Sequence, residues 1–531
     1  MRAIGDRNVA LVALATALSA TSVPALAQTD TPTTAPVEAD VGDPLDIVVT
    51  GQREAEIRAI DAKRAANNIQ DSVASTDVGK LPDQNVAEAV RRLPGISVAN
   101  DQGEGRYVII RGGDPNLANV TINGQTAAAP EPEGRQVKLD DIPSSLIGSV
   151  TVVKTLTADR DANAIAGQVD INTLTAFDRK GTFFYARGAY GLNDLSDRKP
   201  YEGDATFGTR FGANRDFGLV VSGNYSRRPI ESENVQGSVN YRVLNGQVVP
   251  DDFRLRDYNL TRRRYGAVAN LDCRPSDDTQ FFLRTLYSVF KDNETRDQFR
   301  IALPGARAAN GSGTGIFNQV GDTASFTGGR ATRFVRRRIE DDDTLTVQGG
   351  GKLGLGGGAK LSVEGTYSKA TKKDPLRSEF QFRTGNSLAA GVAGTIDLSD
   401  TLFIVDPTGA PNRSYDPSFF SALQVNYDRR RAKEELYQGR ADIEIPLAFG
   451  DDTVIKAGGK FLRRDKTNDR AFQQNDLNGF NLSVAGVNDG LFLYDGRYRF
   501  GPRVDYDRAQ AYVTANPARA VFNRRPRSPT A

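Results

Sequence analysis

The stretch RYVIIRGGDPNLANVTINGQ (106–125) contains two short β-strand patterns separated by a turn-rich segment. Tyr107–Arg111 and Val120–Ile122 are rich in β-branched residues, which favours strands, and Asn123–Gly124 is a dipeptide typical of tight turns. A transmembrane strand needs about 9–11 residues, so strands this short cannot cross a bilayer. The stretch therefore predicts part of a small folded domain that lies outside the hydrocarbon layer.

A helix is predicted directly upstream, in LPDQNVAEAVRRLPG (81–95). Val86, Ala89, Val90 and Leu93 fall on one helical face, at positions i, i+3, i+4 and i+7. Asn85 with Glu88 three residues later resembles a capping box, and Pro94–Gly95 ends the helix.

Further short elements surround this core. Strand patterns occur at Ile96–Val98, Val150–Val152 and Val169–Ile171, and Pro143 begins a single predicted helical turn at Ser144–Ile147. Together they predict a compact mixed α/β domain over residues 54–178.

The pattern changes at about residue 179. Segments of about ten residues alternate two ways, as in transmembrane β-strands. Paired segments predict hairpins, with tight turns at Ala213–Arg215, Pro275–Asp278, Gly356–Gly358 and Gly450–Asp452. About nine or ten such segments occur up to residue 514. Cys273 is expected in the wall of this sheet.

Between the hairpins we expect long polar loops, at about 227–262, 291–343, 371–433 and 465–505. Short turns at one rim and long loops at the other are typical of outer-membrane barrels, whereas a soluble β-sandwich or solenoid explains neither this asymmetry nor the aromatic strand ends. Arg336–Arg338 beside Glu340–Asp343 predicts a salt-bridged, water-facing loop base. The aromatic ends expected to form an interfacial girdle are Tyr190, Phe211, Tyr225, Phe290 and Tyr367.

The N-terminus carries export and tether signals. Residues 1–27 combine a basic start, an apolar run and an Ala-x-Ala end, which predicts a cleaved signal peptide rather than a membrane anchor. Residues 28–53 are predicted to form a flexible tether. Its β-prone patch, Asp46–Thr50, suits strand addition to another protein's sheet edge, although it could equally be the first strand of the next domain.

Composition narrows the function classes. The 531 residues include 68 basic and 66 acidic side chains, a balance that gives no support to a nucleic-acid partner. The single cysteine excludes an internal disulfide, and the absence of histidine excludes histidine-based catalysis and histidine zinc ligands. We therefore expect neither an enzyme nor a bound metal or cofactor.

The order of these segments resembles TonB-dependent outer-membrane receptors. DIVVTG (46–51) looks like a TonB box. KLPDQNVAEAVRRLPGISV (80–98), the stretch 106–125 and SLIGSVTVVKTLTADRDANAIAGQVDINTLTAFD (145–178) are similar to the opening, middle and end of the plug domain, particularly in the subfamily of Xanthomonas- and Caulobacter-like bacteria. The resemblance implies an α/β plug followed by an antiparallel transmembrane β-barrel, which is 22-stranded in such transporters.

The resemblance also implies a function. TonB, with ExbB/ExbD in the inner membrane, would pull on Asp46, Ile47, Val48, Val49 and Thr50, and a scarce nutrient would then cross the outer membrane past its lipids. An oligosaccharide is the expected nutrient, and a siderophore or metal chelate is the alternative. Expected substrate contacts on the plug apices and outer loops are Asp101, Arg106, Asp114, Asn116, Arg135, Tyr415, Phe419 and Tyr427.

The sequence departs from the family pattern at two places. Ala166–Gly167 stands where many members carry Gly-Gly, which puts the local turn geometry in doubt. The barrel region 179–514 has too few segments to enclose a plug, and residues 515–531 form an atypical tail. The expectation is a C-terminally truncated receptor, with a non-functional remnant carrying a soluble plug as the remaining alternative.

Overall fold

The computed structural model describes residues 51–74, 85–179, 181–237, 240–244, 247–304, 315–399, 404–408, 413–447 and 453–523, within one compact unit. The expected signal peptide, the TonB box and the turn at Gly450–Asp452 lie outside the described residues. No helix in the described ranges is long and apolar enough to span a bilayer.

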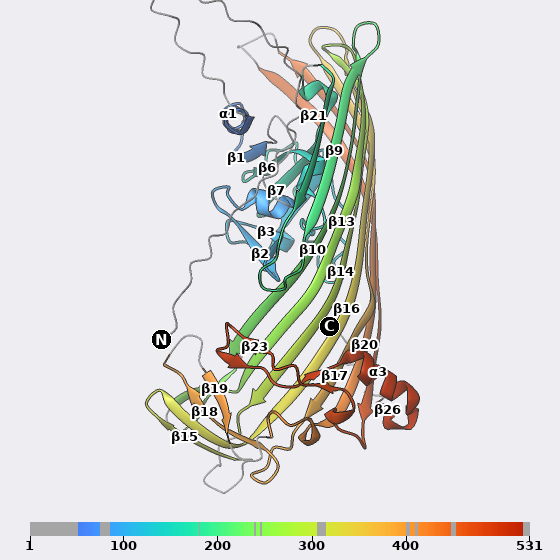
Figure 1. The fold of residues 1–531 in the computed structure, drawn as a ribbon. Coiled ribbons are helices and arrows are strands. Elements are labelled where there is room, and N and C mark those ends of the chain that lie inside the picture. Colours follow the sequence, from blue (N-terminus) through green and yellow to red (C-terminus); the bar gives the residue numbers. More distant parts are fainter. Residues whose placement is uncertain are drawn as a thin grey trace, which may run out of the picture. The chain divides into compact units, whose positions relative to one another are not determined.

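A five-stranded sheet forms the centre of the plug domain (Figure 1). Its order is β1-β6-β7-β4-β5, with β4 and β7 parallel and the other neighbours antiparallel. The sheet strands are β1 (Gln70–Ala74), β4 (Ala118–Ile122), β5 (Gln125–Thr126), β6 (Ile147–Val153) and β7 (Gly167–Thr173). The hairpin β2 (Ile96–Asp101) and β3 (Glu104–Ile110) and the helices α1 (Gly51–Arg64) and α2 (Val86–Val90) complete the domain. The predicted α/β plug is confirmed, although α1 takes in the last residues of the expected tether.

Helix α2 is shorter than the sequence predicts. The side chain of Asn85 accepts a hydrogen bond from the Glu88 backbone N–H at 3.0 Å, as expected of an N-cap. The Glu88 carboxylate, however, accepts from the backbone N–H of Gly105 at 2.6 Å, so it ties the helix to β3 instead of closing the capping box. The predicted apolar face is buried in the plug core.

An antiparallel sheet follows the plug. Its main strands are β8 (Phe183–Tyr190), β9 (Tyr201–Phe211), β10 (Phe217–Gly237), β13 (Asp252–Ser276), β14 (Thr279–Ala302), β16 (Thr323–Gly354), β17 (Lys360–Arg383), β20 (Ser421–Pro446) and β21 (Val454–Leu477). Each pairs with its neighbour along the chain. Shorter strands lie at the long-loop end: β11 (Tyr241–Leu244), β12 (Gln247–Pro250), β15 (Ile316–Val320), β18 (Val392–Asp397) and β19 (Ile404–Thr408). The fold agrees with the predicted barrel type.

The strands are much longer than predicted. Strand β16 has 32 residues and β14 has 24, so most of the stretches expected to be polar loops continue the sheet. A strand with polar residues on both faces is stable where each neighbour pairs in register, because the backbone groups are then satisfied. Alternating hydrophobicity marks only the part of a strand that faces an apolar layer, and the loop prediction was wrong for this reason.

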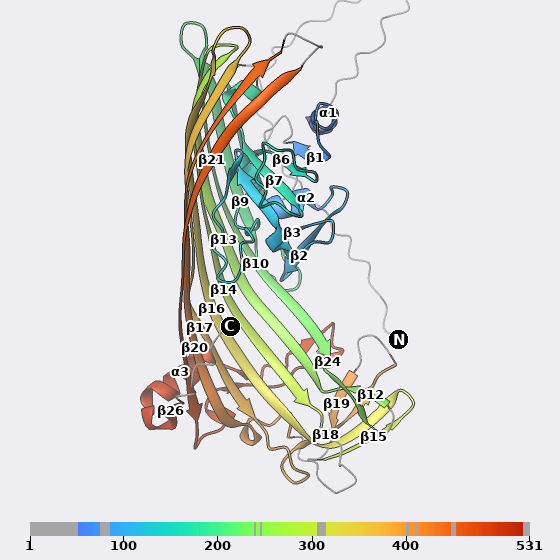
Figure 2. The same ribbon diagram turned by 180° about the vertical axis from the view of Figure 1, so that it is seen from behind.

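The two faces of the sheet differ in what they contact. One face, which we call inward, lies against the plug, and its Val268 and Leu286 belong to the plug core (Figure 2). The outward face exposes large apolar side chains, among them Phe207, Leu283 and Phe461. The predicted girdle residues Tyr190, Phe211 and Tyr225 are exposed, whereas Phe290 is buried. The prediction for Phe290 was wrong because it belongs to the inward face of β14.

The segment after β21 packs on the outward face near the long-loop end. It comprises β22 (Gly486–Val487), β23 (Phe492–Leu493), β24 (Tyr498–Arg499), β25 (Arg503–Val504), α3 (Tyr506–Ala515) and β26 (Ala520–Phe522). Its apolar residues share a cluster with Phe299, Phe380 and Phe382 of the long strands. β26 pairs with the end of β21, so part of the expected tail joins the sheet.

The two ends of the main sheet are not joined in the part of the chain that the structure describes. Here β8 pairs with β9 alone, and β21 pairs with β20 and, over three residues, with β26. The sheet seen in Figure 1 is therefore an open one within these residues.

Gly167 is the position of the Ala166–Gly167 pair that needs a glycine. Its φ is +143°, and a Cβ there would lie 2.7 Å from the carbonyl oxygen of Val153. Ala166 is not among the residues with a positive φ, so its side chain is compatible with the turn. The departure from Gly-Gly thus leaves the local geometry intact.

We expect Gly167→Ala to destabilise the plug by about 1–3 kcal/mol, since the new Cβ combines backbone strain with a clash against β6. Equilibrium urea unfolding of the full chain in detergent micelles, followed by circular dichroism, measures the loss. Gly188→Ala is the matched control, because a Cβ at Gly188 meets nothing within 4 Å. Equal unfolding curves for the two variants would contradict the assignment.

Candidate functional site

Buried charges hold the plug against the inward face of the sheet. Glu104, at the start of β3, forms ion pairs with Arg228 at 2.6 Å, Arg262 at 2.5 Å and Arg264 at 2.6 Å. Burial alone would raise the pKa of Glu104, but the guanidinium groups of Arg264, Arg262 and Arg228 outweigh it and hold that pKa well below its usual range. The carboxylate therefore stays charged at neutral pH.

Arg106 continues this charged network within the plug. It lies 2.7 Å from Asp101 and 3.2 Å from Asp140, and Asp101 also lies 3.3 Å from Arg262 of the sheet. Burial would lower the pKa of Arg106, but Asp140 and Asp101 outweigh it and keep the guanidinium charged. Two of the predicted substrate contacts, Asp101 and Arg106, are thus brought together as part of the plug–sheet interface.

Lys138 is the centre of a second charged cluster. Its fully buried ammonium lies 3.1 Å from Asp141 and 2.7 Å from Glu340, and it also pairs with Asp342. The ring of Phe290 lies beneath it, at 4.5 Å. Burial would lower the pKa of Lys138, but the surrounding carboxylates outweigh it and hold that pKa well above its ordinary value. Within the plug, burial raises the pKa of Asp141 to about 6 although Lys138 is close.

Lys372 of β17 extends the cluster. It lies 3.3 Å from Glu340 and 3.1 Å from Glu131 of the plug. We call Glu104, Arg106, Lys138 and their ion-pair partners the plug seat. Since a buried charge that loses its partner costs several kcal/mol, the members of the plug seat depend on one another.

Hydrogen bonds to side chains of the sheet hold a second part of the plug, Thr126–Ala129. The side chain of Gln438 accepts from the backbone N–H of Thr126 at 3.0 Å and donates to the Thr126 carbonyl at 2.8 Å. The backbone N–H groups of Ala128 and Ala129 donate to Ser368 at 3.2 Å and to Glu434 at 2.6 Å. The plug backbone here is held by side chains of β17 and β20.

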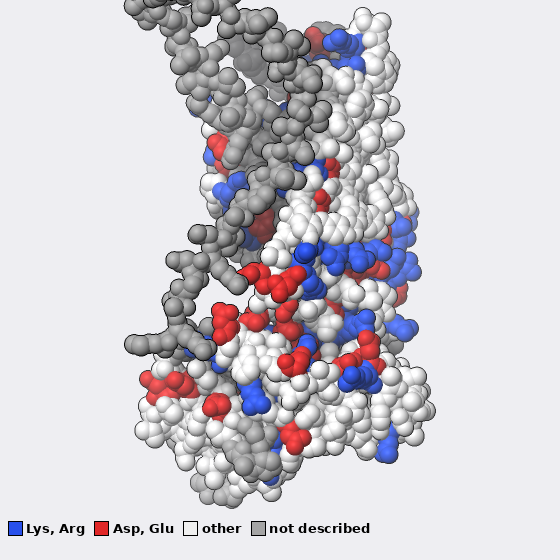
Figure 3. Space-filling view, in the orientation of Figure 1, with Lys and Arg blue, Asp and Glu red and all other residues white. Residues whose placement is uncertain are grey.

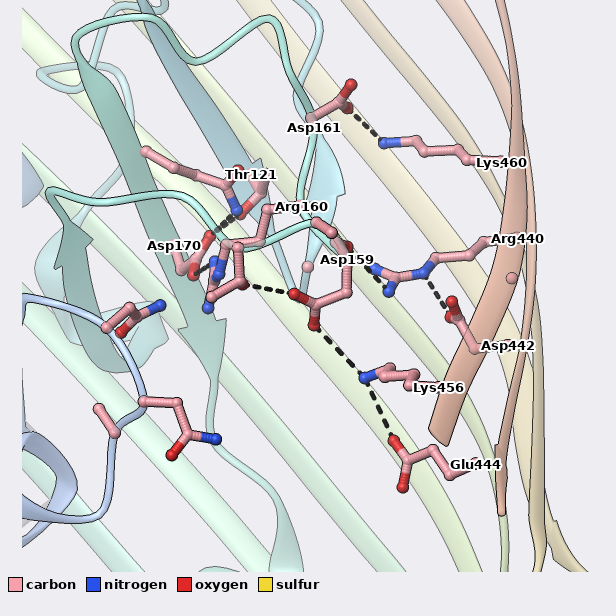
Figure 4. Close-up of a pocket in the computed structure, with 18 of the residues that line it drawn as sticks. Thr121, Asp159, Arg160, Asp161, Asp170, Arg440, Asp442, Glu444, Lys456 and Lys460 are labelled. Atoms are coloured by element: carbon pink, nitrogen blue, oxygen red, sulfur yellow. Dashed lines mark hydrogen bonds and ion pairs between the residues drawn. The ribbon is translucent and has the colours of Figure 1, made fainter. Parts of the chain in front are cut away.

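A cavity of about 1,100 Å³ separates the plug from β20 and β21 near the short-turn rim (Figure 4). Its walls carry ion pairs: Lys460 lies 2.7 Å from Asp161, and Lys456 lies 3.3 Å from Asp159. Arg440 donates to the Asp159 carbonyl at 3.1 Å. The residues that follow the centre of α1, from Ala62 to Gln70, form another wall. The segment that leads to the TonB box thus borders a polar cavity.

Within the described residues, β1 lies at the edge of the plug sheet and pairs only with β6. Asp71 on β1 is clamped by Lys63 of α1 at 2.7 Å and by Lys154. Burial would raise the pKa of Asp71, but its hydrogen bonds from Lys154 and Lys63 lower it overall. Because β6 is its one strand neighbour in the described part of the chain, removal of β1 would leave the pairing of the other plug strands intact.

Three other predicted contacts lie together on the plug surface. The Asp114 carboxylate accepts from the Asn116 backbone N–H at 2.8 Å, and the Asn116 side chain accepts from the Arg135 backbone N–H at 2.9 Å. Arg135 also donates to the Asn163 carbonyl. Their role in substrate binding stays a prediction.

The predicted aromatic contacts lie elsewhere: Tyr415 and Tyr427 pack against the apolar cluster of the outward face, and Phe419 lies in the turn before β20. Tyr415 packs 6.3 Å from Phe299, Phe419 lies under Arg413, and the Tyr427 hydroxyl bonds to Gln510 of α3 at 2.8 Å. The structure does not bring these three residues to the plug apices.

The plug seat is not predicted by the local sequence patterns. The prediction of a water-facing loop base at Arg336–Arg338 and Glu340–Asp343 was wrong: these residues lie in β16, and Arg338, Glu340 and Asp342 are buried on the inward face. The signal was present as charges spaced two apart in a strand, which places them all on one face.

Further arginines line the inward face on the long-loop side of the plug seat. One comes from each of six strands, and we call them the arginine row: Arg256, Arg296, Arg336, Arg377, Arg430 and Arg470. In register, Arg296 faces Arg336 and Arg430 faces Arg470. This wall is the part of the inward face next to Gln102 of the plug, which bonds to Glu294.

Comparisons with known proteins agree with this architecture. Residues 62–168 match the TonB-dependent Receptor Plug Domain family. Similar solved structures include a variant of the ferric enterobactin receptor PfeA from Pseudomonas aeruginosa, at 10% identity and a TM-score of 0.35, covering 79% of this chain and 78% of that one. The siderophore receptor PiuA from Acinetobacter baumannii follows at 12% identity and 0.31, covering 77% and 62%. The copper transporter OprC matches at 12% and 0.30, covering 78% and 63%.

TM-scores this low do not support a family assignment. The assignment rests on the match of the plug residues and on the fold. Receptors of this family act in transport and are not enzymes. The match does not distinguish subfamilies, so the expected Xanthomonas- and Caulobacter-type subfamily stays a prediction. A plug-family match over residues that fold as a plug, followed by an antiparallel sheet whose inward face holds them, identifies the protein as a TonB-dependent outer-membrane receptor.

Proposed function

We propose that this receptor takes up a scarce nutrient that is a small anion, of the class that includes siderophores and other metal chelates. TonB-dependent transport follows from the family, and the arginine row supports the choice of substrate. These side chains lie where a ligand entering from the long-loop side would meet the wall beside the plug.

The arginine row has fewer carboxylates than guanidinium groups. Arg296 pairs with Glu379 at 2.6 Å, and Arg336 pairs with Glu294 at 2.6 Å. Glu294 also forms an ion pair with Arg338, at 3.2 Å. Excess positive charge in a cleft attracts anions, and a guanidinium binds carboxylate or catecholate oxygens through two parallel hydrogen bonds.

The other arginines of the row also have too few carboxylate partners. Arg430 and Arg470 share Asp428, each at 2.8 Å, and Arg377 lies 3.8 Å from Asp374. Arg256 bonds to the neutral Gln298 at 2.7 Å. An anionic ligand would supply the acceptors that these guanidinium groups share among themselves.

A neutral oligosaccharide has less support. Sugar binding relies on aromatic stacking, whereas Tyr415 and Tyr427 pack against the apolar cluster of the outward face and Phe419 lies under Arg413. An oligosaccharide that carries acidic groups would fall within the proposed class. Among oligosaccharides, we therefore propose only those that carry acidic groups as substrates.

We propose that transport is coupled to TonB through strand addition. Asp46–Thr50 would pair with TonB, which works with ExbB/ExbD, and the pull would pass to α1 and then to β1. Release of the Asp71 clamp would remove β1 and one wall of the cavity beside β20 and β21. The space next to that cavity is where the substrate would leave the receptor.

Loss of two arginines tests the substrate class. We expect Arg336→Gln/Arg430→Gln to weaken binding of a ferric tris-catecholate probe about tenfold or more, because each lost guanidinium removes a charge-assisted contact of about 1.5–3 kcal/mol. Calorimetric titration of the full chain in neutral detergent measures this, with neutral maltohexaose as the comparison ligand.

Arg215→Gln/Lys352→Gln removes the same charge at the short-turn rim and should leave binding unchanged. Tighter binding of maltohexaose than of the chelate, or equal affinities for both double variants, would count against an anionic substrate.

A proline in the TonB box tests the drive independently of the substrate. Val48→Pro removes a backbone N–H donor and blocks strand pairing. We expect binding of the periplasmic domain of TonB to the full chain to fall at least tenfold in a pull-down titration. Val37→Pro makes the same change in the tether and should keep wild-type binding. If both variants bind alike, residues 46–50 are not the TonB contact.

Removal of the central lysine tests the plug seat. Lys138→Met leaves Glu340, Asp342 and Asp141 without their common cation and should destabilise the plug by about 3–5 kcal/mol. Lys456→Met breaks a partly exposed pair and should cost about 0–1 kcal/mol. Urea unfolding and protease sensitivity of the plug measure both, and a Lys138→Met protein as stable as Lys456→Met would refute the role of the cluster.

A further inference from the structure

Two carboxyl groups from opposite sides of the plug–sheet interface contact the same cation. Asp141 of the plug lies 3.1 Å from the ammonium of Lys138, and Asp342 of β16 accepts a hydrogen bond from it. Both side chains are buried, with exposed fractions of 4% and 2%. Their Oδ1 atoms have no hydrogen-bond partner within the described residues. We call Asp141 and Asp342 the carboxyl pair.

The other nearby cations are engaged by different carboxylates. Lys372 of β17 lies 3.3 Å from Glu340 and 3.1 Å from Glu131 of the plug. Arg338 lies 3.2 Å from Glu340, and two further carboxylates of β14 share its guanidinium. Within the described residues, neither Lys372 nor Arg338 lies within ion-pair distance of the carboxyl pair. Lys138 is therefore the common counter-ion of both carboxyl groups.

The elements on the remaining sides add no cation to the carboxyl pair. Asp140, the chain neighbour of Asp141, takes the guanidinium of Arg106 of β3 at 3.2 Å. Arg264 of β13 donates to the Asp140 carbonyl at 2.7 Å. Ser288 of β14 donates to the carbonyl of Asp141 and not to its carboxyl group. The unsatisfied oxygens of the carboxyl pair thus stay unsatisfied from these sides.

The charges of this cluster do not balance. Four carboxylates lie around Lys138 and Lys372: Asp141, Asp342, Glu340 and Glu131. Against them stand two ammonium groups and the shared guanidinium of Arg338. Figure 3 shows Lys and Arg among Asp and Glu on the visible surface of the long-loop end, where water can solvate an excess charge. A buried carboxylate in excess takes up a proton instead.

The titration of Asp141 agrees with this charge count. Burial raises the pKa of Asp141 to about 6, and Asp140 and Glu340 add to the rise while Lys138 opposes it. Burial would raise the pKa of Asp140 as well, but Arg106 and Lys138 outweigh burial and lower it overall. Two adjacent aspartates thus differ because one has a guanidinium partner and the other shares an ammonium.

We propose that the carboxyl pair is a proton-binding site that exists only while the plug is seated. One proton lies on one of the two carboxyl groups, and the other group stays ionised beside Lys138. Withdrawal of the plug would separate Asp141 from Asp342 and admit water. The O–H bond would then break, the proton would pass to water, and both groups would be carboxylates. This inference rests on the plug seat and is independent of the substrate.

Proton binding makes the strength of the seat depend on pH. The pKa of Asp141 is higher in the seated plug than in an unfolded chain, so the bound proton favours the seated state. That contribution is fully present below about pH 4, the ordinary pKa of an aspartate, and is lost as the pH rises to about 6. Within this window the equilibrium constant for unseating should rise by up to about tenfold for each pH unit.

The test counts protons. The full chain in neutral detergent micelles is unfolded with urea in unbuffered solution, and a pH-stat measures the protons released. At pH 5 the wild type should release close to one proton more per chain than either Asp141→Asn or Asp342→Asn, and at pH 8 this difference should disappear. Infrared spectra at pH 5 should show the carbonyl stretch of a protonated carboxyl group in the wild type and a weaker band in both variants.

Asp161→Asn is the matched control. It makes the same change at another plug–sheet ion pair, with Lys460 at 2.7 Å, where hydrogen bonding from Lys460 outweighs burial and lowers the pKa of Asp161. This variant should release as many protons as the wild type. Equal release at pH 5 by the wild type, Asp141→Asn and Asp342→Asn would overturn the proposal. A wild-type infrared spectrum without a protonated carboxyl band at pH 5 would overturn it too, even if the variants did not fold.

Discussion

The structure depends on charges that are buried between the plug and the inward face of the sheet. Lys138 has no exposure to water, and its ammonium is balanced by Asp141 from the plug and by Glu340 and Asp342 from β16. A comparable apolar interface would be easier to form and harder to undo. A charged interface of this kind is stable only while every partner is in place, so it gives one well-defined seat for the plug. That property would suit a domain that is held firmly and released by a pull, as in the proposed function.

The sequence predicted the plug closely because its signals are local. The strand patterns around 106–125, the N-cap at Asn85 and the turn at Asn123–Gly124 depend on residues within a few positions of one another. The plug seat could not be found in this way. Lys138 and Glu340 are 202 residues apart, and their pairing follows from the seating of one domain on another.

Strand length and side-chain direction were the other failures, and both have the same origin. Alternating hydrophobicity reports an apolar layer on one side of a strand, so it ends where that layer ends, while the backbone pairing of β14 with β16 continues. Phe290 was placed in the girdle because it closes an apolar segment, although its position in the two-residue repeat points it inward under Lys138. Charged residues spaced two apart in a strand lie on one face. This spacing, seen in Arg336, Arg338, Glu340 and Asp342, indicates a charged inward face that composition alone does not.

The polar character of the plug seat has a consequence for the space that the plug would vacate. An apolar wall left behind by a moving domain tends to stay dry and to close again. The wall here carries Arg262, Arg264, Glu340 and Lys372, all of which gain hydration energy once water reaches them. Such a wall wets at once, and a wet passage can conduct a charged solute without stripping its hydration shell. The residues that lock the plug in place would thus become the lining of the channel.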